Sequence, residues 1–131
     1  MSKKKIAIIT LSVVYVAAMG ALLWNYNIEG PKRASSAFLS SIITKGDATA
    51  AYKQTSSTYQ HNVSLAEFTQ FFQGLMSSKV KYSVKDEKVT AGNAVTAGSI
   101  FDYQGANYVY IFHLERQGGT WLIDSTYNTK Q

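Results

Sequence analysis

Aromatic and β-branched residues alternate through the stretch NYVYIFHLERQGGTWLIDS, from Asn107 to Ser125. This composition favours β-strands, and the two glycines in the middle readily supply the positive φ angles of a two-residue hairpin turn. The pattern therefore predicts two antiparallel strands joined at Gly118-Gly119. The expected cross-strand pairs are Gln117 with Thr120, Arg116 with Trp121, Leu114 with Ile123, and His113 with Asp124.

Both faces of this predicted hairpin are apolar. One face has enough apolar residues to cover a core, namely Tyr108, Tyr110, Phe112, Leu114, Trp121 and Ile123. The other face carries Val109, Ile111, His113, Leu122 and Asp124. Residues normally alternate along a strand so that the sheet face in contact with water is polar. We therefore expect these five residues to form an interface, with a second copy of the chain or with another subunit.

Helical patterns precede the strands. The first helix is expected from residue 31 to about residue 44, with Pro31 in its first turn and Lys45-Gly46 at its end. Asp47 is placed to cap a second, shorter helix.

A third helix follows a polar connection. Thr55–Asn62 is interpreted as that connection, with Tyr59 turned inward. Ser64 and Glu67 have the spacing of a capping box, which opens the third helix. The apolar face expected for this helix consists of Leu65, Phe68, Phe71, Phe72 and Leu75.

Two more strands are expected between the helices and the hairpin. Residues 79–85 alternate between lysine or serine and apolar residues, and Asp86-Glu87 suggests a turn. Ala94–Tyr103 forms the next strand, in which Gly98 suggests a bulge or bend. Helices followed by an antiparallel meander predict an α+β domain, with three helices packed on one face of a curved sheet.

The amino terminus has the pattern of a membrane anchor. Ile6–Trp24 contains no charged residue and, as a helix, would measure about 28 Å, close to the thickness of a hydrocarbon core. Lys3–Lys5 should stay in the cytoplasm, which places the folded domain outside it. A signal peptide cleaved after Ala18-Met19-Gly20 is the alternative. We therefore divide the chain into a cytoplasmic tip and anchor (1–26), a linker (27–30) and an extracytoplasmic domain (31–131).

Charge and cysteine content exclude several classes of function. The net charge is +5, but Lys3–Lys5 account for three of these charges, and the rest of the chain carries only +2. A nearly neutral domain lacks the basic surface of a nucleic-acid-binding protein, so we expect no nucleic-acid partner. The absence of cysteine excludes disulfides, thiolate metal sites and a cysteine nucleophile.

Several motifs stand in an order that resembles small bacterial NTF2-like (cystatin-like) domains. They are Ala37-Phe38-Leu39, Lys45-Gly46-Asp47-Ala48-Thr49-Ala50-Ala51-Tyr52, Ser64-Leu65-Ala66-Glu67-Phe68 and Gly118-Gly119-Thr120-Trp121-Leu122-Ile123-Asp124. The resemblance spans roughly residues 31–127 and implies a cone, in which a curved sheet wraps a long helix and a pocket opens at the wide end. The superfamily contains ketosteroid isomerase and dehydratase enzymes. It also contains members that only bind partners, including inner-membrane subunits of type IV secretion systems with a single amino-terminal anchor.

Few residues suggest chemistry. Tyr52, Tyr59, Tyr103, Tyr108 and Tyr110 are candidate pocket-lining residues, although tyrosines so spaced more often pack in a core with the hydroxyl at its rim. His113 beside Asp124 would orient a general base, or would be a polar pair at a partner interface. No position matches the tyrosine and two aspartates of the isomerases, and His61 is expected on a surface loop. We expect no catalytic residue, no metal and no cofactor.

These observations predict a single-pass protein of the cytoplasmic (inner) membrane. Its partners would be the lipid bilayer, through Ile6–Trp24, and other membrane-complex subunits or a second copy. The expected role is that of a non-catalytic accessory or scaffold subunit of a larger membrane or envelope complex. The alternative is a tethered small-molecule-binding domain, or an isomerase or dehydratase, that uses the NTF2-like pocket.

Overall fold

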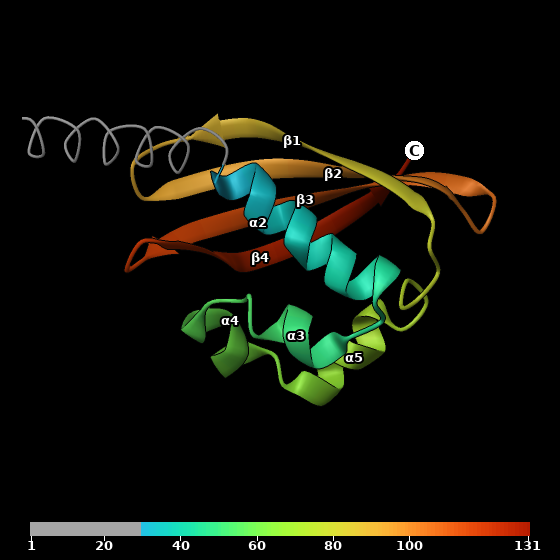
Figure 1. The fold of residues 1–131 in the computed structure, drawn as a ribbon, viewed down its shortest axis with the longest axis horizontal. Helices are drawn as coiled ribbons and strands as arrows, with labels where there is room; N and C mark the ends of the chain where they lie inside the picture. The colour runs from blue at the N-terminus through green and yellow to red at the C-terminus, as the bar shows by residue number, and fades with distance from the viewer. Residues whose placement is uncertain (1–29) are drawn as a thin grey trace, which may run out of the picture.

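The computed structural model describes residues 30–131, which form four α-helices, a short π-helix and a four-stranded antiparallel sheet (Figure 1). The helical elements are α2 (Gly30–Leu39), the π-helix η1 (Ser40–Thr44), α3 (Ala48–Tyr52), α4 (Ser57–Asn62) and α5 (Leu65–Phe72). The strands β1 (Lys81–Val89), β2 (Asn93–Tyr103), β3 (Ala106–Gln117) and β4 (Thr120–Lys130) pair in chain order. The predicted α+β class, with helices followed by an antiparallel meander, is confirmed.

The anchor predicted at Ile6–Trp24 lies outside the described residues, as does the linker apart from Gly30, which already belongs to α2. Within residues 30–131, no helix combines the length and the apolar character needed to cross a membrane.

The helix ends have the caps that the sequence predicts. Asp47 accepts a hydrogen bond from the Ala50 N–H at 3.0 Å and caps α3. Ser64 and Glu67 make both hydrogen bonds of the capping box at the start of α5. Gly46, just past η1, has a φ of +63°, a conformation that glycine adopts without steric cost.

Residues 57–62 form a helix, so the polar connection expected there is wrong, and the domain has four helices instead of three. Ser56 caps α4 by accepting a hydrogen bond from the Tyr59 N–H at 3.1 Å. Tyr59 is buried, as predicted. The sequence STYQHN has no apolar stripe, and hydrophobic periodicity therefore gives no helical signal.

The first helix ends in a π-helical turn that contacts a distant loop. The carbonyl oxygens of Ile42 and Ile43 accept hydrogen bonds from the N–H groups of Ser77 and Lys79, both at 3.0 Å. Ser77 and Lys79 have φ angles of 56° and 55°, which are uncommon for residues with a side chain. These hydrogen bonds attach the segment between α5 and β1 to the end of the first helix.

The first strand is longer than expected. Asp86-Glu87 was predicted to turn the chain, but both residues lie within β1. The register of the pairing with β2 shifts between Asp86 and Lys88, which places a β-bulge at this point. The chain therefore reaches Val89 before it turns.

Gly98 has a different role from the bulge or bend predicted for it. It pairs regularly with Val84 on one side and Tyr110 on the other. A Cβ atom at this position would lie 2.9 Å from Leu39 Cδ1, closer than such atoms approach. Glycine is therefore needed because the first helix packs directly on the backbone of β2.

The β3–β4 hairpin has the predicted turn and most of the predicted pairs. Gly118 and Gly119 have φ angles of +55° and +87°. The confirmed pairs are Gln117 with Thr120, Arg116 with Trp121, and Leu114 with Ile123. The pairing of His113 with Asp124 is wrong, because His113 pairs with Ser125 and Asp124 is the extra residue of a β-bulge.

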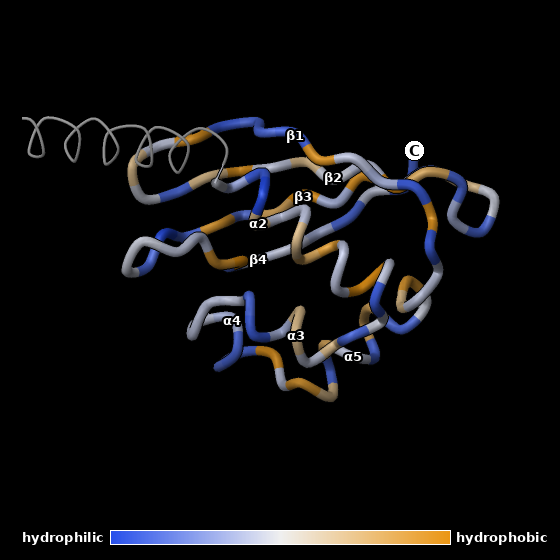
Figure 2. Tube along the Cα trace, in the orientation of Figure 1, coloured by the Kyte–Doolittle hydropathy of each residue, from blue (hydrophilic) through white to orange (hydrophobic). Residues whose placement is uncertain are grey.

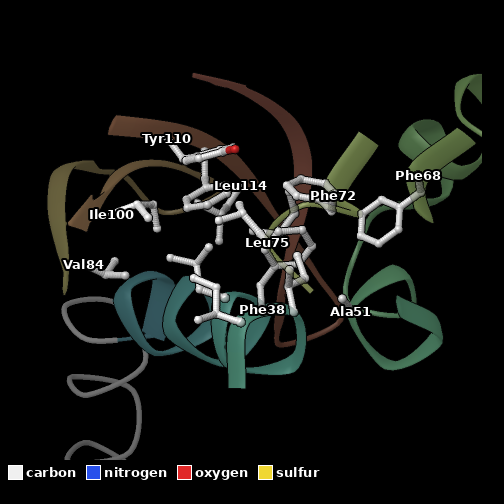
Figure 3. Packing of buried hydrophobic residues seen from close by; sticks show 14 of the residues in the cluster. Phe38, Ala51, Phe68, Phe72, Leu75, Val84, Ile100, Tyr110 and Leu114 are labelled. Carbon is white, nitrogen blue, oxygen red and sulfur yellow. The ribbon is translucent and has the colours of Figure 1, made fainter. Parts of the chain in front are cut away.

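Phenylalanine side chains form the centre of the core (Figure 3). The Phe38 ring makes edge-to-face contacts with Phe72 and Phe112, each at a centroid distance of 5.6 Å, and with Phe68 at 5.9 Å. All four side chains have 0% or 1% exposure. They fill the space between the first helix and the sheet.

The faces predicted to enter the core are largely confirmed. On the hairpin, Tyr110, Phe112, Leu114, Trp121 and Ile123 are buried, and Tyr108 packs at the edge of the core. On and just after α5, Phe68, Phe72 and Leu75 are buried. Leu65 and Phe71 are instead exposed, because they lie to either side of the stripe that faces Phe38.

Candidate functional sites

The sheet face opposite α2, here called the outer face, is apolar along its middle. Its apolar residues are Val95, Ala97, Phe101, Val109, Ile111, Leu122 and Tyr127. Phe101 and Tyr127 are 43% and 52% exposed. Ile111, which pairs with Ala97 on one side and Tyr127 on the other, is partly exposed. The helices of residues 30–131 lie on the other face of the sheet or beside β4 (Figure 1). Four of the five predicted interface residues, all but Asp124, lie on this face.

Lysines border the outer face along β1. Lys81, Lys85 and Lys88 are exposed and pair with residues of the outer face on β2. Lys85 Nζ also lies 3.3 Å from the Glu87 carboxylate. Figure 2 shows β1 as mostly hydrophilic, whereas β2 and β3 carry apolar segments. The outer face thus has an apolar centre and a basic border.

Asp124 is turned toward the helices. Its Oδ1 accepts a hydrogen bond from Ser56 Oγ at 2.6 Å, and Ser56 is fully buried. The Ser56 N–H donates to Ile123 O at 2.8 Å, and the Ile123 N–H donates to Gln54 O at 2.9 Å. The segment before α4 therefore joins the edge of β4 through a single parallel bridge, between Thr55 and Ile123.

His113 stays on the outer face. Its ring lies 6.1 Å from the ring of Tyr127, and it borders a hollow of about 360 Å³ that Lys88 and Asp124 also line. The bulge and the hydrogen bond of Asp124 to Ser56 keep the two side chains from forming a cross-strand pair. The imidazole–carboxylate pair that would orient a general base is therefore not formed.

A second hollow, here called the edge cleft, lies between the helices and β4 and has a volume of about 640 Å³. The helical wall consists of Tyr59, Asn62, Val63, Glu67, Gln70 and Phe71, and the strand wall of Asp124, Ser125 and Thr126. Among residues 30–131, the lining includes Phe71, which is 59% exposed, and two carboxylates, but no Lys, Arg or His. The edge cleft is therefore acidic with an aromatic patch.

Tyr59 connects the edge cleft to the core. Burial raises the pKa of the Tyr59 hydroxyl; a hydrogen bond with the Thr126 side chain opposes this effect, and nearby Tyr52 adds to it. The Tyr59 ring also lies 6.2 Å from the ring of Phe68 in the core. Tyr59 thus carries one polar atom at the cleft and an apolar body inside the domain.

The other four candidate pocket residues lie elsewhere. Tyr52 Oη donates a hydrogen bond to Val63 O at 2.6 Å, which fixes its hydroxyl against the backbone. Tyr103 and Tyr108 pack against each other at 5.7 Å, and Tyr110 stacks on Phe112 at 6.3 Å. The five tyrosines do not line one cavity, and their rings mainly pack against other aromatic rings.

No protein-family model matches the sequence, and no curated protein matches it. Among solved structures, the chain is similar to the crystal structure, at 1.75 Å resolution, of an NTF2-like protein of unknown function from Shewanella baltica OS155. The two chains are 17% identical, with a TM-score of 0.47 over 91% of this chain and 95% of that chain.

The edge cleft was not predicted from the sequence, because it depends on α4 and on the bulge in β4. The one available signal was Phe71, which lies next to the Phe68–Phe72 stripe and has no core position to occupy. His61 is exposed in α4, and residues 30–131 contain no group of three His, Asp or Glu residues placed to hold a metal ion.

Proposed function

We propose that this chain is a single-pass membrane protein whose NTF2-like domain is a non-catalytic accessory or scaffold subunit of a larger membrane or envelope complex. The observation that carries the proposal is the outer face, with its apolar centre on three strands. Soluble domains rarely expose such a patch unless it binds a partner. Its lysine border favours a partner with acidic residues around its own apolar patch.

The filled interior supports a scaffold role over the alternative. A small-molecule-binding or isomerase-type domain needs an open pocket with a few convergent polar groups. Phe38, Phe72 and Phe112 fill the space between the first helix and the sheet, and the hydroxyl of Tyr52 is bonded to the backbone. Of the five candidate pocket tyrosines, only Tyr59 lines the hollow of about 640 Å³ beside β4. We therefore propose that the domain acts through contacts between its surface and partner proteins.

The location of the domain is part of the proposal. Ile6–Trp24 would anchor the chain in the cytoplasmic membrane, and Lys3–Lys5 would hold the amino terminus inside. Partners of the outer face would then be extracytoplasmic domains of neighbouring subunits, or a second copy. The anchor restricts the domain to the membrane surface, which raises its effective concentration toward such partners.

Ile111→Lys tests the proposal at the centre of the outer face. A buried, unpaired ammonium group should weaken assembly about tenfold or more, since central interface residues contribute most of the binding energy. Oligomer size and co-purifying subunits of the full-length tagged protein in mild detergent are the measurements. Ala37→Lys is the matched control, because it places the same charge at an exposed position of α2.

The outcomes separate the function classes. Loss of assembly in Ile111→Lys with an unchanged melting temperature is expected, together with normal assembly in Ala37→Lys. If Ile111→Lys unfolds the domain, its side chain is interior and the interface does not exist. An activity that His113→Ala abolishes, without any change in assembly, would favour the enzyme alternative.

A further inference from the structure

The carboxy-terminal half of β4 is an open sheet edge. Ile123 directs its N–H and C=O away from β3, toward Gln54 and Ser56, whereas Gln131 donates its N–H inward to Asn107 O at 2.8 Å. After the bulge, alternation along an antiparallel strand turns the backbone groups of Thr126, Asn128 and Lys130 away from β3. Within residues 30–131, no strand pairs with these groups.

The two edges of the sheet differ in how they are protected. Natural edge strands usually carry lysines or a β-bulge that prevents pairing with another chain. Both edge strands have a bulge, near Glu87 in β1 and at Asp124 in β4, but exposed lysines at 81, 85 and 88 follow the β1 edge along its length. Residues 125–129 of β4, with the sequence STYNT, lie beyond the β4 bulge and carry no charge, and three of them, Thr126, Tyr127 and Thr129, favour strands. The β4 edge is therefore the one able to accept a further strand.

The edge cleft begins where this open edge begins. Its strand wall includes Asp124, Ser125 and Thr126, and its opposite wall comes from α4 and α5, which lie beside β4 (Figure 1). A chain segment placed along β4 would therefore pass Glu67 and Phe71 on its other side. The strand wall supplies backbone donors and acceptors, and the helical wall supplies a carboxylate and an aromatic ring.

We propose that the edge cleft binds an extended, positively charged peptide segment of a partner protein, which adds to the sheet as a fifth strand beside β4. Backbone hydrogen bonds to Thr126 and Asn128 would hold the peptide, as in other cases of strand addition. Lysine or arginine side chains would face Glu67 and Asp124, and an apolar side chain would pack on Phe71. This site is separate from the outer face, and either can exist without the other.

Charge and shape favour a peptide over a second copy of the chain. Among residues 30–131, the cleft lining contains two carboxylates and no basic residue, whereas residues 125–129 in β4 of a second copy carry no charge that could pair with them. A second copy would also bring its own α4 and α5 beside its β4, where they would meet the helices of the first copy. A single extended segment avoids this collision.

The test uses the full-length chain in mild detergent and a fluorescent eight-residue peptide in which lysine alternates with valine. We expect saturable binding by fluorescence anisotropy, and NMR shifts at the amides of Thr126 and Asn128. N-methylation of alternate peptide residues removes the backbone donors and should weaken binding at least about tenfold. Replacement of the peptide lysines by glutamate should abolish binding. Detergent without protein is the background control.

Two pairs of protein variants test the same contacts. Asn128→Pro removes the outward N–H and should also reduce binding at least about tenfold, because proline is tolerated at an edge but cannot donate. Asn128→Ala loses the same side chain, keeps the N–H, and should retain binding. Glu67→Gln keeps the capping box and should weaken binding about two- to fivefold, through loss of charge alone. Lys85→Gln is the charge control on the opposite edge.

Several results would overturn the proposal. These are an absence of saturable binding, affinity unaffected by N-methylation, or NMR shifts centred on Val109, Ile111 and Tyr127 instead of Thr126 and Asn128. If Asn128→Pro unfolds the domain, the N-methylated peptide still tests whether backbone hydrogen bonds hold the peptide, because that experiment uses the unchanged protein. The outer-face proposal fails independently, through normal assembly of Ile111→Lys.

Discussion

Tyr59 shows how one side chain can serve both packing and a surface site. Its ring belongs to the core cluster, next to Phe68, while its hydroxyl reaches Thr126 in the wall of the edge cleft. Burial makes the ionised form of this hydroxyl unfavourable and raises its pKa. Burial also raises the pKa of the Tyr110 hydroxyl, and a hydrogen bond with the Asn128 side chain opposes this effect.

These two tyrosines should make the domain less stable at high pH. Unfolded tyrosine ionises near pH 10, while the folded groups hold their protons to higher pH, so the unfolded state loses protons first. The stabilisation is fully present below about pH 10 and is lost above it. We expect Tyr59→Phe to flatten this decline in denaturant titrations between pH 8 and pH 11, and Tyr59→Phe/Tyr110→Phe to flatten it further. An unchanged slope in the double variant would contradict the burial of both hydroxyls.

Asp124 shows what local pattern cannot predict at the scale of a residue. Counting outward from Gly118-Gly119 gives the correct register as far as Ile123, because the turn fixes it. The bulge that follows coincides with the attachment of residues 54–56 to the edge of β4, a contact between segments far apart in sequence. A hairpin considered alone contains no sign of that contact, and so the residue expected to pair with His113 instead bonds Ser56.

At the scale of the element, end signals were more reliable than periodicity. Asp47, Gly46 and the Ser64–Glu67 box mark real helix ends, since each satisfies backbone groups by local geometry that the sequence encodes directly. α4 was missed because only one of its six residues, Tyr59, enters the core. The glycine in β2 was noticed, but its reason, the approach of the first helix, depends on tertiary packing.

Gly98→Val tests that close approach. A Cβ there would lie 2.9 Å from Leu39 Cδ1 and 3.1 Å from Phe112 Cε2, so the first helix would have to move away from β2. We expect a loss of about 1–3 kcal/mol in the free energy of unfolding, measured by urea titration. Ser99→Val is the matched control, because it adds a branched side chain on the outer face of the same strand. Equal stability of the two variants would show that the helix does not depend on this glycine.

At the scale of the whole molecule, the domain has a filled interior and two open surfaces. The first surface, the outer face, could be predicted from the sequence. Both faces of the hairpin are apolar, but only one of them can cover the core, so the other remains at the surface. The second surface was not predicted, since the edge cleft is formed by three elements that meet only in the folded chain. Class and strand order could be predicted because helical and strand patterns occupy separate halves of the chain.

The proposed anchor makes a prediction for the intact protein. Full-length protein should remain in the membrane pellet after carbonate extraction, because nineteen uncharged residues favour the hydrocarbon core over water. Protease added outside should reach the domain but not an amino-terminal tag. Release of a soluble form lacking its first residues would instead identify a cleaved signal peptide.

The hydrogen bonds from Ser77 and Lys79 to the last turn of the first helix have a consequence for folding. That turn and the loop that meets it are separated by more than 30 residues, so neither can complete its hydrogen bonds until α3, α4 and α5 have closed the distance between them. The helix end and the loop thus belong to one cooperative unit, although one lies before these three helices and the other after them. The amide protons of Ser77 and Lys79 would exchange with solvent only when this whole unit opens, and their exchange rates would report the opening of the helical half from the sheet.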